Sequence, residues 1–195
     1  MGTDDQINTL SRLFRVSHET ISSLKKYEKL LIKANNSLNL IGKSTLNQIW
    51  NRHFIDSFQV IDFIDKNNNS LIDMGSGAGF PGMVLAIAAK DKNIPIKITL
   101  VEKSKKKANF LNDIKNELNL NVHVICKNIL NDNEKLTSQV FVARAFKPFE
   151  IILELIHNKI ENFEKFFVFL GKTGSRDLLQ ASKNWDIKYK QRMSI

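Results

Sequence analysis

The fold is decided by residues 70–82, which read Ser70-Leu71-Ile72-Asp73-Met74-Gly75-Ser76-Gly77-Ala78-Gly79-Phe80-Pro81-Gly82. A short apolar run ends near an acid, glycine then recurs at every second position, and residues 83–90 are typical of a helix. Strand, glycine turn and helix in this order form the edge of an α/β sheet where a cofactor reaches the backbone. Glycine suits such a turn because a Cβ would block close approach and because other residues resist positive φ.

Two classes of ligand compete for this turn. The string G-x-G-x-x-G, present from Gly77 to Gly82, is typical of dinucleotide folds in which a pyrophosphate binds the helix N-terminus. The glycine series begins earlier, at Gly75 behind Asp73, where a carboxylate would repel a pyrophosphate but could hold a cationic amino group. Acid-x-Gly-x-Gly-x-Gly after an apolar strand is the pattern of S-adenosylmethionine (AdoMet) methyltransferases. We therefore favour AdoMet, bound by Asp73, Gly75, Gly77 and Gly79, over an NAD-type oxidoreductase or a turn without ligand.

A second acid, Glu102, ends the apolar run of residues 96–102. A carboxylate at the end of the second strand is placed to bind a ribose diol through paired hydrogen bonds. NAD and AdoMet both carry that diol, so Glu102 predicts an adenosine-bearing ligand without separating the two.

Composition indicates a polyanionic partner and a reducing compartment. The 195 residues carry a net charge of +9, which suits nucleic acid, although a lysine-rich coding bias also explains it. The single cysteine, Cys126, excludes an internal disulfide and a Cys-rich zinc site, and we expect it to be buried in a strand. We expect no metal site, and no apolar run approaches the ~18 residues that cross a membrane. The cytoplasm is the predicted location.

The apolar spacing predicts an N-terminal helical portion, residues 1–66, packed on a sheet domain of residues 67–195. Its helices are expected at 4–15, at 17–34 with Ser17 as N-cap, and at 45–65 with Ser44 as N-cap. The expected strands are 70–74, 96–102, 122–126, 139–143, 165–170 and, weakly patterned, 185–195. The expected helices between the strands are 82–90, 104–118 and 148–160. The Gly171–Gly174 segment resembles part of a P-loop, but Phe166 replaces the required first glycine.

Four segments of the chain carry a resemblance to a known family. They are Asn39-Leu40, Arg52-His53-Phe54-Ile55-Asp56-Ser57, the turn of residues 73–82, and Ala143-Arg144-Ala145-Phe146. Together they resemble the bacterial small-subunit ribosomal RNA guanine-N7 methyltransferases (methyltransferase G, or glucose-inhibited division protein B). The likeness extends from about residue 20 to about residue 175.

The resemblance implies a Rossmann-like class I AdoMet-dependent methyltransferase sheet. By position, the residues that match the family's cofactor contacts are Gly75, Phe80, Ile129, Leu130 and Arg144, with Glu102 as the ribose-binding acid. Leu130 stands where the family often has an acid, Ile41 stands where threonine is usual, and residue 195 precedes the last strand that the family normally adds.

The implied reaction needs no general base, because guanine N7 carries a lone pair and no proton. We expect Arg144 to be catalytic by serving both cofactor and RNA, and Arg52, His53 and Lys172 to guide the RNA, while lysines 103–107 meet phosphates. The expected partner is small-subunit ribosomal RNA or the ribosomal subunit, bound by a monomer. A non-catalytic RNA-binding assembly factor is the alternative outside enzymes.

Overall fold

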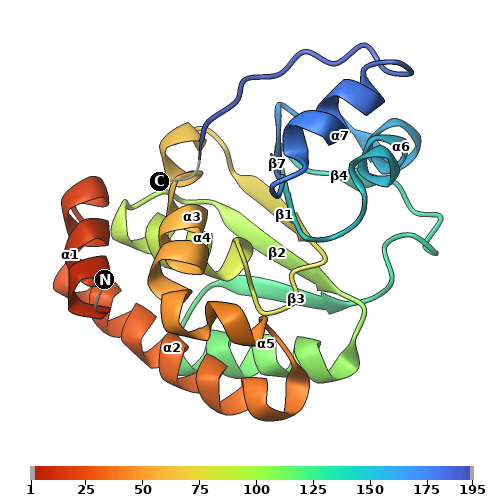
Figure 1. The fold of residues 1–195 in the computed structure, drawn as a ribbon. Coiled ribbons are helices and arrows are strands. Elements are labelled where there is room, and N and C mark those ends of the chain that lie inside the picture. The colour runs from red at the N-terminus through yellow and green to blue at the C-terminus, as the bar shows by residue number, and fades with distance from the viewer. Residues whose placement is uncertain (1–2, 194–195) are drawn as a thin grey trace.

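Five parallel strands form the central sheet of the computed structural model, which describes residues 3–193 (Figure 1). The strand order is β3-β2-β1-β5-β7, so the chain moves outward from β1 and then returns to its other side. The strands are β1 (Ser70–Met74), β2 (Lys97–Glu102), β3 (Val122–Cys126), β5 (Val140–Arg144) and β7 (Lys165–Phe169). The order in which the chain adds strands to the sheet reverses between β1 and β5. A ligand crevice is therefore expected at the carboxyl ends of these two parallel strands.

Helices cover both faces of the sheet, which confirms the predicted α/β class. Helices α4 (Gly82–Asp91) and α5 (Lys105–Glu117) pack on one face, in a core that includes Leu71 and Val142. Helix α6 (Phe149–Lys159) packs on the other face, against Phe141 and Ala143. Successive residues of β5 therefore pack into the two cores in alternation, Val140 and Val142 into one and Phe141 and Ala143 into the other. A strand that is buried on both faces in this way has a continuous run of apolar residues.

The N-terminal helices α1 (Thr3–Phe14) and α2 (His18–Leu38) share the core of α4 and α5. Ser17 caps α2 as predicted, since its hydroxyl accepts a hydrogen bond from the Thr20 N–H at 3.2 Å. The Thr20 hydroxyl donates in turn to Asp91 at 2.7 Å, which joins the start of α2 to the end of α4. Leu24, Tyr27 and Leu31 of α2 are fully buried.

The predicted helix of residues 45–65 is wrong, and Ser44 caps nothing. The segment forms a 3-10 helix η1 (Lys43–Gln48), a π-helix η2 (Trp50–Ile55), a short α3 (Asp56–Phe58) and a 3-10 helix η3 (Ile61–Phe63). A π turn closes over five residues rather than four, so residues four and five apart share a side. Trp50, Phe54 and Ile55 are all buried by this wider turn.

The C-terminal third also differs from expectation. A helix α7 (Gly174–Ala181) and a two-stranded parallel pair, β4 (Leu136–Thr137) with β6 (Ile160–Glu161), were not predicted. Residues 186–193 form no strand, and residues 194–195 of that predicted strand lie outside the described part. Cys126 is exposed rather than buried, because β3 is the edge strand and Cys126 is its last residue. Between residues 3 and 193, no helix has the length and apolar character needed to span a bilayer.

Candidate functional site

The glycine turn leaves β1 and passes over the carboxyl ends of the central strands. Gly75, Gly77 and Gly79 have φ values of +73°, +56° and +99°. A Cβ at Gly75 would collide with the ring of Phe146, and one at Gly79 would collide with the Tyr27 hydroxyl. Glycine is therefore required at both positions by backbone conformation and by space.

The turn is tied to its neighbours through its backbone. The N–H groups of Gly75 and Ser76 donate to the Val101 carbonyl at 2.9 and 3.0 Å. From α2, the buried Tyr27 hydroxyl donates to the Ala78 carbonyl at 2.5 Å, and its ring stacks on Phe80. These contacts fix the turn to β2 on one side and to α2 on the other.

Asp73 lies beneath the turn. Its side chain is fully buried, and one carboxylate oxygen accepts the Gly82 N–H at 3.0 Å. Burial raises the pKa of Asp73 to about 7, although the Gly82 hydrogen bond opposes that rise. The other oxygen has no hydrogen-bond partner within residues 3–193. Asp73 thus holds the start of α4 against the strand end.

Glu102 lies at the edge of the turn. One carboxylate oxygen accepts the Gly77 N–H at 2.9 Å, and the other accepts the Ser104 N–H at 2.7 Å. A carboxylate accepts about four hydrogen bonds, so each oxygen keeps acceptor capacity beyond its backbone partner. The side chain is buried by the surrounding protein yet lines the adjoining cavity.

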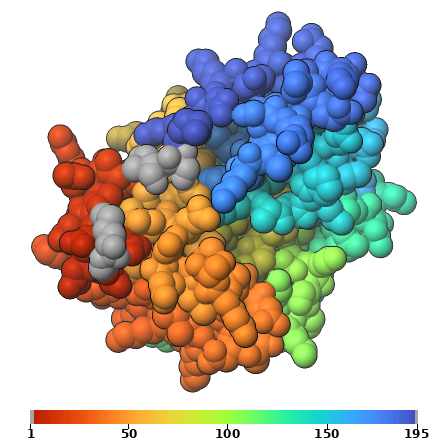
Figure 2. Space-filling view, in the orientation of Figure 1, coloured from red at the N-terminus to blue at the C-terminus, as the bar shows by residue number. Residues whose placement is uncertain are grey.

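A cavity of about 440 Å³ opens at the carboxyl ends of the strands. In the space-filling view, the orange segment around η1 and η2 and the blue C-terminal part rise on either side of a recess (Figure 2). The predicted site residues that line this cavity are His53, Gly75, Gly77, Phe80, Glu102, Ile129, Leu130 and Arg144. Those that do not line it are Arg52, Asp73, Gly79 and Lys172.

His53 packs flat against Phe80, with ring centroids 4.8 Å apart and planes at 13°. Its Nε2 lies 3.1 Å from the Thr45 hydroxyl, and its Nδ1 is buried with no partner in the described chain. Burial lowers the pKa of His53 to about 3, and the nearby cations Arg144 and Arg52 add to that decrease. The imidazole is therefore neutral near pH 7.

Arg144 links the end of β5 to the irregular segment η2–α3. Its Nη2 donates to the Arg52 carbonyl and lies 3.3 Å from a carboxylate oxygen of Asp56. The guanidinium also lies over the Phe169 ring, 5.5 Å from the centroid. Its Nη1 is buried without a partner among residues 3–193. The Arg52 side chain itself is exposed, so Arg52 contributes its backbone to this junction.

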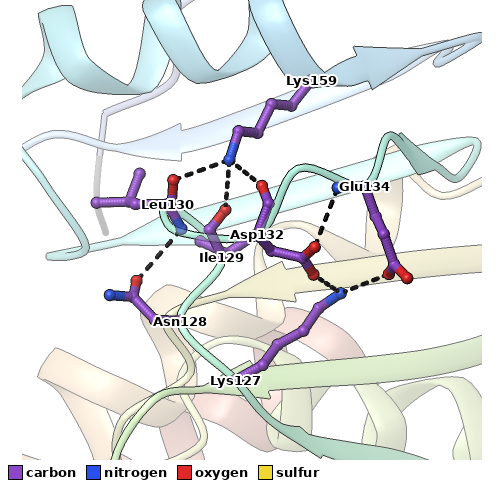
Figure 3. Close-up of polar contacts among 7 residues, drawn as sticks. All are labelled: Lys127, Asn128, Ile129, Leu130, Asp132, Glu134 and Lys159. Carbon is purple, nitrogen blue, oxygen red and sulfur yellow. Dashed lines mark hydrogen bonds and ion pairs between the residues drawn. The ribbon is translucent and has the colours of Figure 1, made fainter.

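The loop of residues 127–135 follows β3, and its first four residues, 127–130, line the cavity. Figure 3 shows the polar contacts that hold this loop. The Asn128 side chain accepts the Leu130 N–H at 3.2 Å. Lys127 pairs with Asp132 and with Glu134, the latter at 3.3 Å. Ile129 is buried and Leu130 half-buried, so the wall between these polar contacts is apolar.

The cavity rim is basic. The lysines among its lining residues are Lys103, Lys107, Lys127 and Lys147, whereas Glu102 is the one acid in that lining within residues 3–193. The same described part holds no cluster of His, Cys, Asp or Glu that could bind a metal ion. Lys172 lies farther out, exposed between β7 and α7. The arrangement suits a ligand with an adenosine-like end and an anionic partner outside it.

Sequence reasoning missed several residues of the site. Tyr27 lies within the helix predicted over residues 17–34 and was given no role there, yet its hydroxyl reaches the glycine turn. Asn128 lines the cavity, and the ammonium of Lys159 holds the loop behind it. The Asn128 position, two residues past a strand end, was a usable signal, whereas nothing local marks Tyr27 or Lys159.

Known proteins resemble this chain over nearly its whole length. The family profile described as "GidB: rRNA small subunit methyltransferase G" matches residues 20–195. A protein named ribosomal RNA small subunit methyltransferase G from Pelagibacter ubique is 37% identical over 182 residues, covering 92% of this chain and 85% of that protein. The protein of that name from Rickettsia felis is 33% identical, covering 94% of this chain and 91% of that one.

Solved structures are more distant. Coclaurine N-methyltransferase matches with a TM-score of 0.49 and 16% identity, covering 85% of this chain and 58% of that one. The assignment to a family therefore rests on the sequence matches. The structure adds that the glycine turn, Glu102 and Arg144 line one cavity. The sequence matches favour a methyltransferase over the dinucleotide oxidoreductase that the G-x-G-x-x-G string left open. The chain belongs to the GidB family of rRNA small subunit methyltransferase G.

Proposed function

We propose that this chain transfers a methyl group from AdoMet to N7 of a guanine in small-subunit ribosomal RNA. The observation that carries the proposal is the convergence of the glycine turn, Glu102 and the Ile129–Leu130 wall on one cavity in a member of this family. The finer assignments, N7 as the acceptor atom and a role for each residue, are part of the proposal.

The residues present fit AdoMet. Glu102 keeps acceptor capacity for a ribose diol beside its two backbone partners. Ile129 and Leu130 offer an apolar surface for an adenine ring, and the cavity of about 440 Å³ lies within the range of small-molecule sites. Asp73 acts in this proposal from beneath the turn, through the Gly82 N–H and together with Gly79, rather than by touching the ligand. AdoMet supplies an electrophilic methyl group on a sulfonium.

The chemistry requires alignment rather than proton transfer. Guanine N7 presents an in-plane lone pair and no proton, so no base has to be activated. The groups that line the cavity agree with this. His53, with its pKa lowered to about 3, is a weak base, and both oxygens of Glu102 already accept backbone N–H groups. The protein's task is then to hold the acceptor nitrogen in line and within ~3.5 Å of the methyl carbon.

Arg144 is the residue proposed to touch both cofactor and RNA. Its position is fixed by the Arg52 carbonyl and Asp56, while the buried Nη1 remains without a partner within residues 3–193. A hydrogen-bond donor held in place in this way can orient the guanine that accepts the methyl group with little reorganisation of the protein.

RNA access is proposed to involve the rim. N7 faces the deep, narrow major groove of A-form RNA, so the target guanine must lie in a loop or be turned out of its stack. Arg52, His53 and Lys172 are proposed to guide the RNA, and Lys103 and Lys107 to meet its phosphates. The proposed partner is free ribosomal RNA or the ribosomal subunit, bound by a cytoplasmic monomer.

The test is methyl transfer from tritiated AdoMet to small-subunit ribosomal RNA and to the isolated subunit, with mass-spectrometric mapping of the product. Wild-type protein should label one guanine at N7. Arg144→Ala should lower the rate about 100-fold or more while the protein still folds, as far-UV circular dichroism would show. Arg12→Ala, on an exposed position of α1, is the matched control. Near-normal turnover of Arg144→Ala would refute its role, and RNA binding without methylation would indicate an assembly factor.

A further inference from the structure

The ammonium group of Lys159 donates to three backbone carbonyls of one loop. Lys159 is the last residue of α6, and its ammonium approaches Ile129, Leu130 and Asp132 from the side opposite Lys127 (Figure 3). Its Nζ donates to the carbonyls of Ile129 at 3.2 Å, of Leu130 at 2.8 Å, and of Asp132. A lysine ammonium has three N–H donors, so these three carbonyls account for all of them.

The three contacts fix the direction of the loop backbone. Carbonyls that converge on one cation must turn toward α6 together, and the intervening peptide groups are then constrained. Two of their N–H groups are satisfied within the loop: the Leu130 N–H donates to the Asn128 side chain, and the Asn131 N–H donates to the Asn128 carbonyl. The two carbonyls and the Leu130 N–H are thus engaged within the protein, and Ile129 and Leu130 line the cavity.

The end of α6 anchors the loop at a second place. Lys135, at the far end of the loop, donates to the Asn158 carbonyl at 3.1 Å and pairs with Glu161 at 3.1 Å. Directly after the loop, β4 pairs with β6, which begins at the residue after Lys159. A cation in the last turn of a helix is also favoured by the helix dipole. The α6–β6 junction is therefore a rigid support behind the loop.

We propose that Lys159 is a positioning residue for the adenine side of the AdoMet site. It holds the 129–132 backbone so that Ile129 and Leu130 present a preformed apolar wall, and without it the loop must be ordered when the ligand binds. This inference rests on the proposed function for the identity of the ligand. Lys159 itself does not line the cavity and touches no reacting group.

The test uses Lys159→Met, which keeps the length of the side chain and removes the ammonium. The matched control is Lys92→Met, because Lys92 also donates to a backbone carbonyl, that of Phe14 at 2.6 Å, but lies away from the cavity. Binding is measured by calorimetry with S-adenosylhomocysteine and, in competition, with adenosine. Hydrogen exchange of the free protein reports the Leu130 and Asn131 amides.

Lys159→Met should weaken both ligands by the same factor, on the order of tenfold, and speed exchange of those two amides by about tenfold. Lys92→Met should change neither. The proposal would be overturned if Lys159→Met bound adenosine as tightly as wild type does, or if hydrogen exchange of its Leu130 and Asn131 amides were unchanged. If wild type binds neither ligand while the exchange effect is present, the proposed function fails and the role of Lys159 in ordering the loop stands.

Discussion

The glycine turn of residues 75–82 and the loop of residues 127–135 line the same cavity but are held by different physical means. The turn is fixed by buried, uncharged or partly protonated partners: the Tyr27 hydroxyl and the Asp73 carboxyl. The loop is fixed by cations at partly exposed positions, Lys127 and Lys159. The difference predicts that changes at the turn destabilise the whole fold, whereas changes at the loop alter one wall of the site.

The physical reason lies in what each broken contact leaves behind. A buried carbonyl or N–H that loses its partner bears the full cost of desolvation, about 1–3 kcal/mol. An ion pair near the surface contributes between about 0 and 1 kcal/mol, because water replaces the lost partner. The variants below compare the two regions on this basis.

The largest effect is expected at the centre of the turn. Gly79→Ala must adopt φ near +99° and direct its Cβ at the Tyr27 hydroxyl. Backbone strain and overpacking together should lower the free energy of unfolding by about 4 kcal/mol or more, measured by urea denaturation. Gly171→Ala is the control, since a Cβ there meets no atom within 4 Å.

A double variant separates the two contributions. Tyr27→Phe removes the hydroxyl, so Tyr27→Phe with Gly79→Ala should cost clearly less than the sum of the single changes. Tyr27→Phe alone should cost about 1–3 kcal/mol, because the buried Ala78 carbonyl loses its donor. Strict additivity would show that the Cβ collision is relieved elsewhere and that α2 does not support the turn.

The next effect is a pH dependence specific to the turn. Burial raises the pKa of Asp73 from 3.8 to about 7, so the folded state binds a proton that the unfolded state has released between those values. That stabilisation is present below about pH 4 and is lost as the pH rises through 7. Relative to wild type, Asp73→Asn should therefore gain about 2–3 kcal/mol in unfolding free energy between pH 5 and pH 8.

His53 acts with the opposite sign in an overlapping window. Its pKa falls from 6.5 to about 3 on folding, so protonation of the unfolded chain removes stability as the pH falls below about 6.5. The two groups offset each other in wild type, and Asp73→Asn should reveal the His53 slope. A difference between Asp73→Asn and wild type that does not vary with pH would contradict the burial of a titrating acid beneath the turn.

The smallest effect is expected at the loop. Asp132→Asn removes the ion pair with Lys127, while its side-chain oxygen can still accept the Glu134 N–H. The midpoint of thermal unfolding should stay within about 2 °C of wild type at low and high salt. A larger decrease would mean that the loop, like the turn, supports the fold.

The regular part of the fold was predictable because its signals are local. The Ser17 cap, the apolar strands and the helical spacing of α5 each lie within one turn or one strand, and the structure agrees to within a residue or two. The segment of residues 45–65 was not predictable in this way. The spacing of its apolar residues fits an α-helix of 3.6 residues per turn as well as it fits a π turn. The choice between the two depends on packing against α1 and the sheet, which the local sequence does not show.

The sequence by itself determined the glycine turn, the two acids at the strand ends and the family, because each can be recognised from short segments of consecutive residues. The tertiary structure decided which acid reaches the cavity: Glu102 lines it, and Asp73 lies beneath it. It also decided that Arg144 holds the carbonyl of Arg52, 92 residues away, and that Lys159 holds the loop after β3. Such contacts join segments that only chain folding brings together, so no local pattern of residue types could encode them.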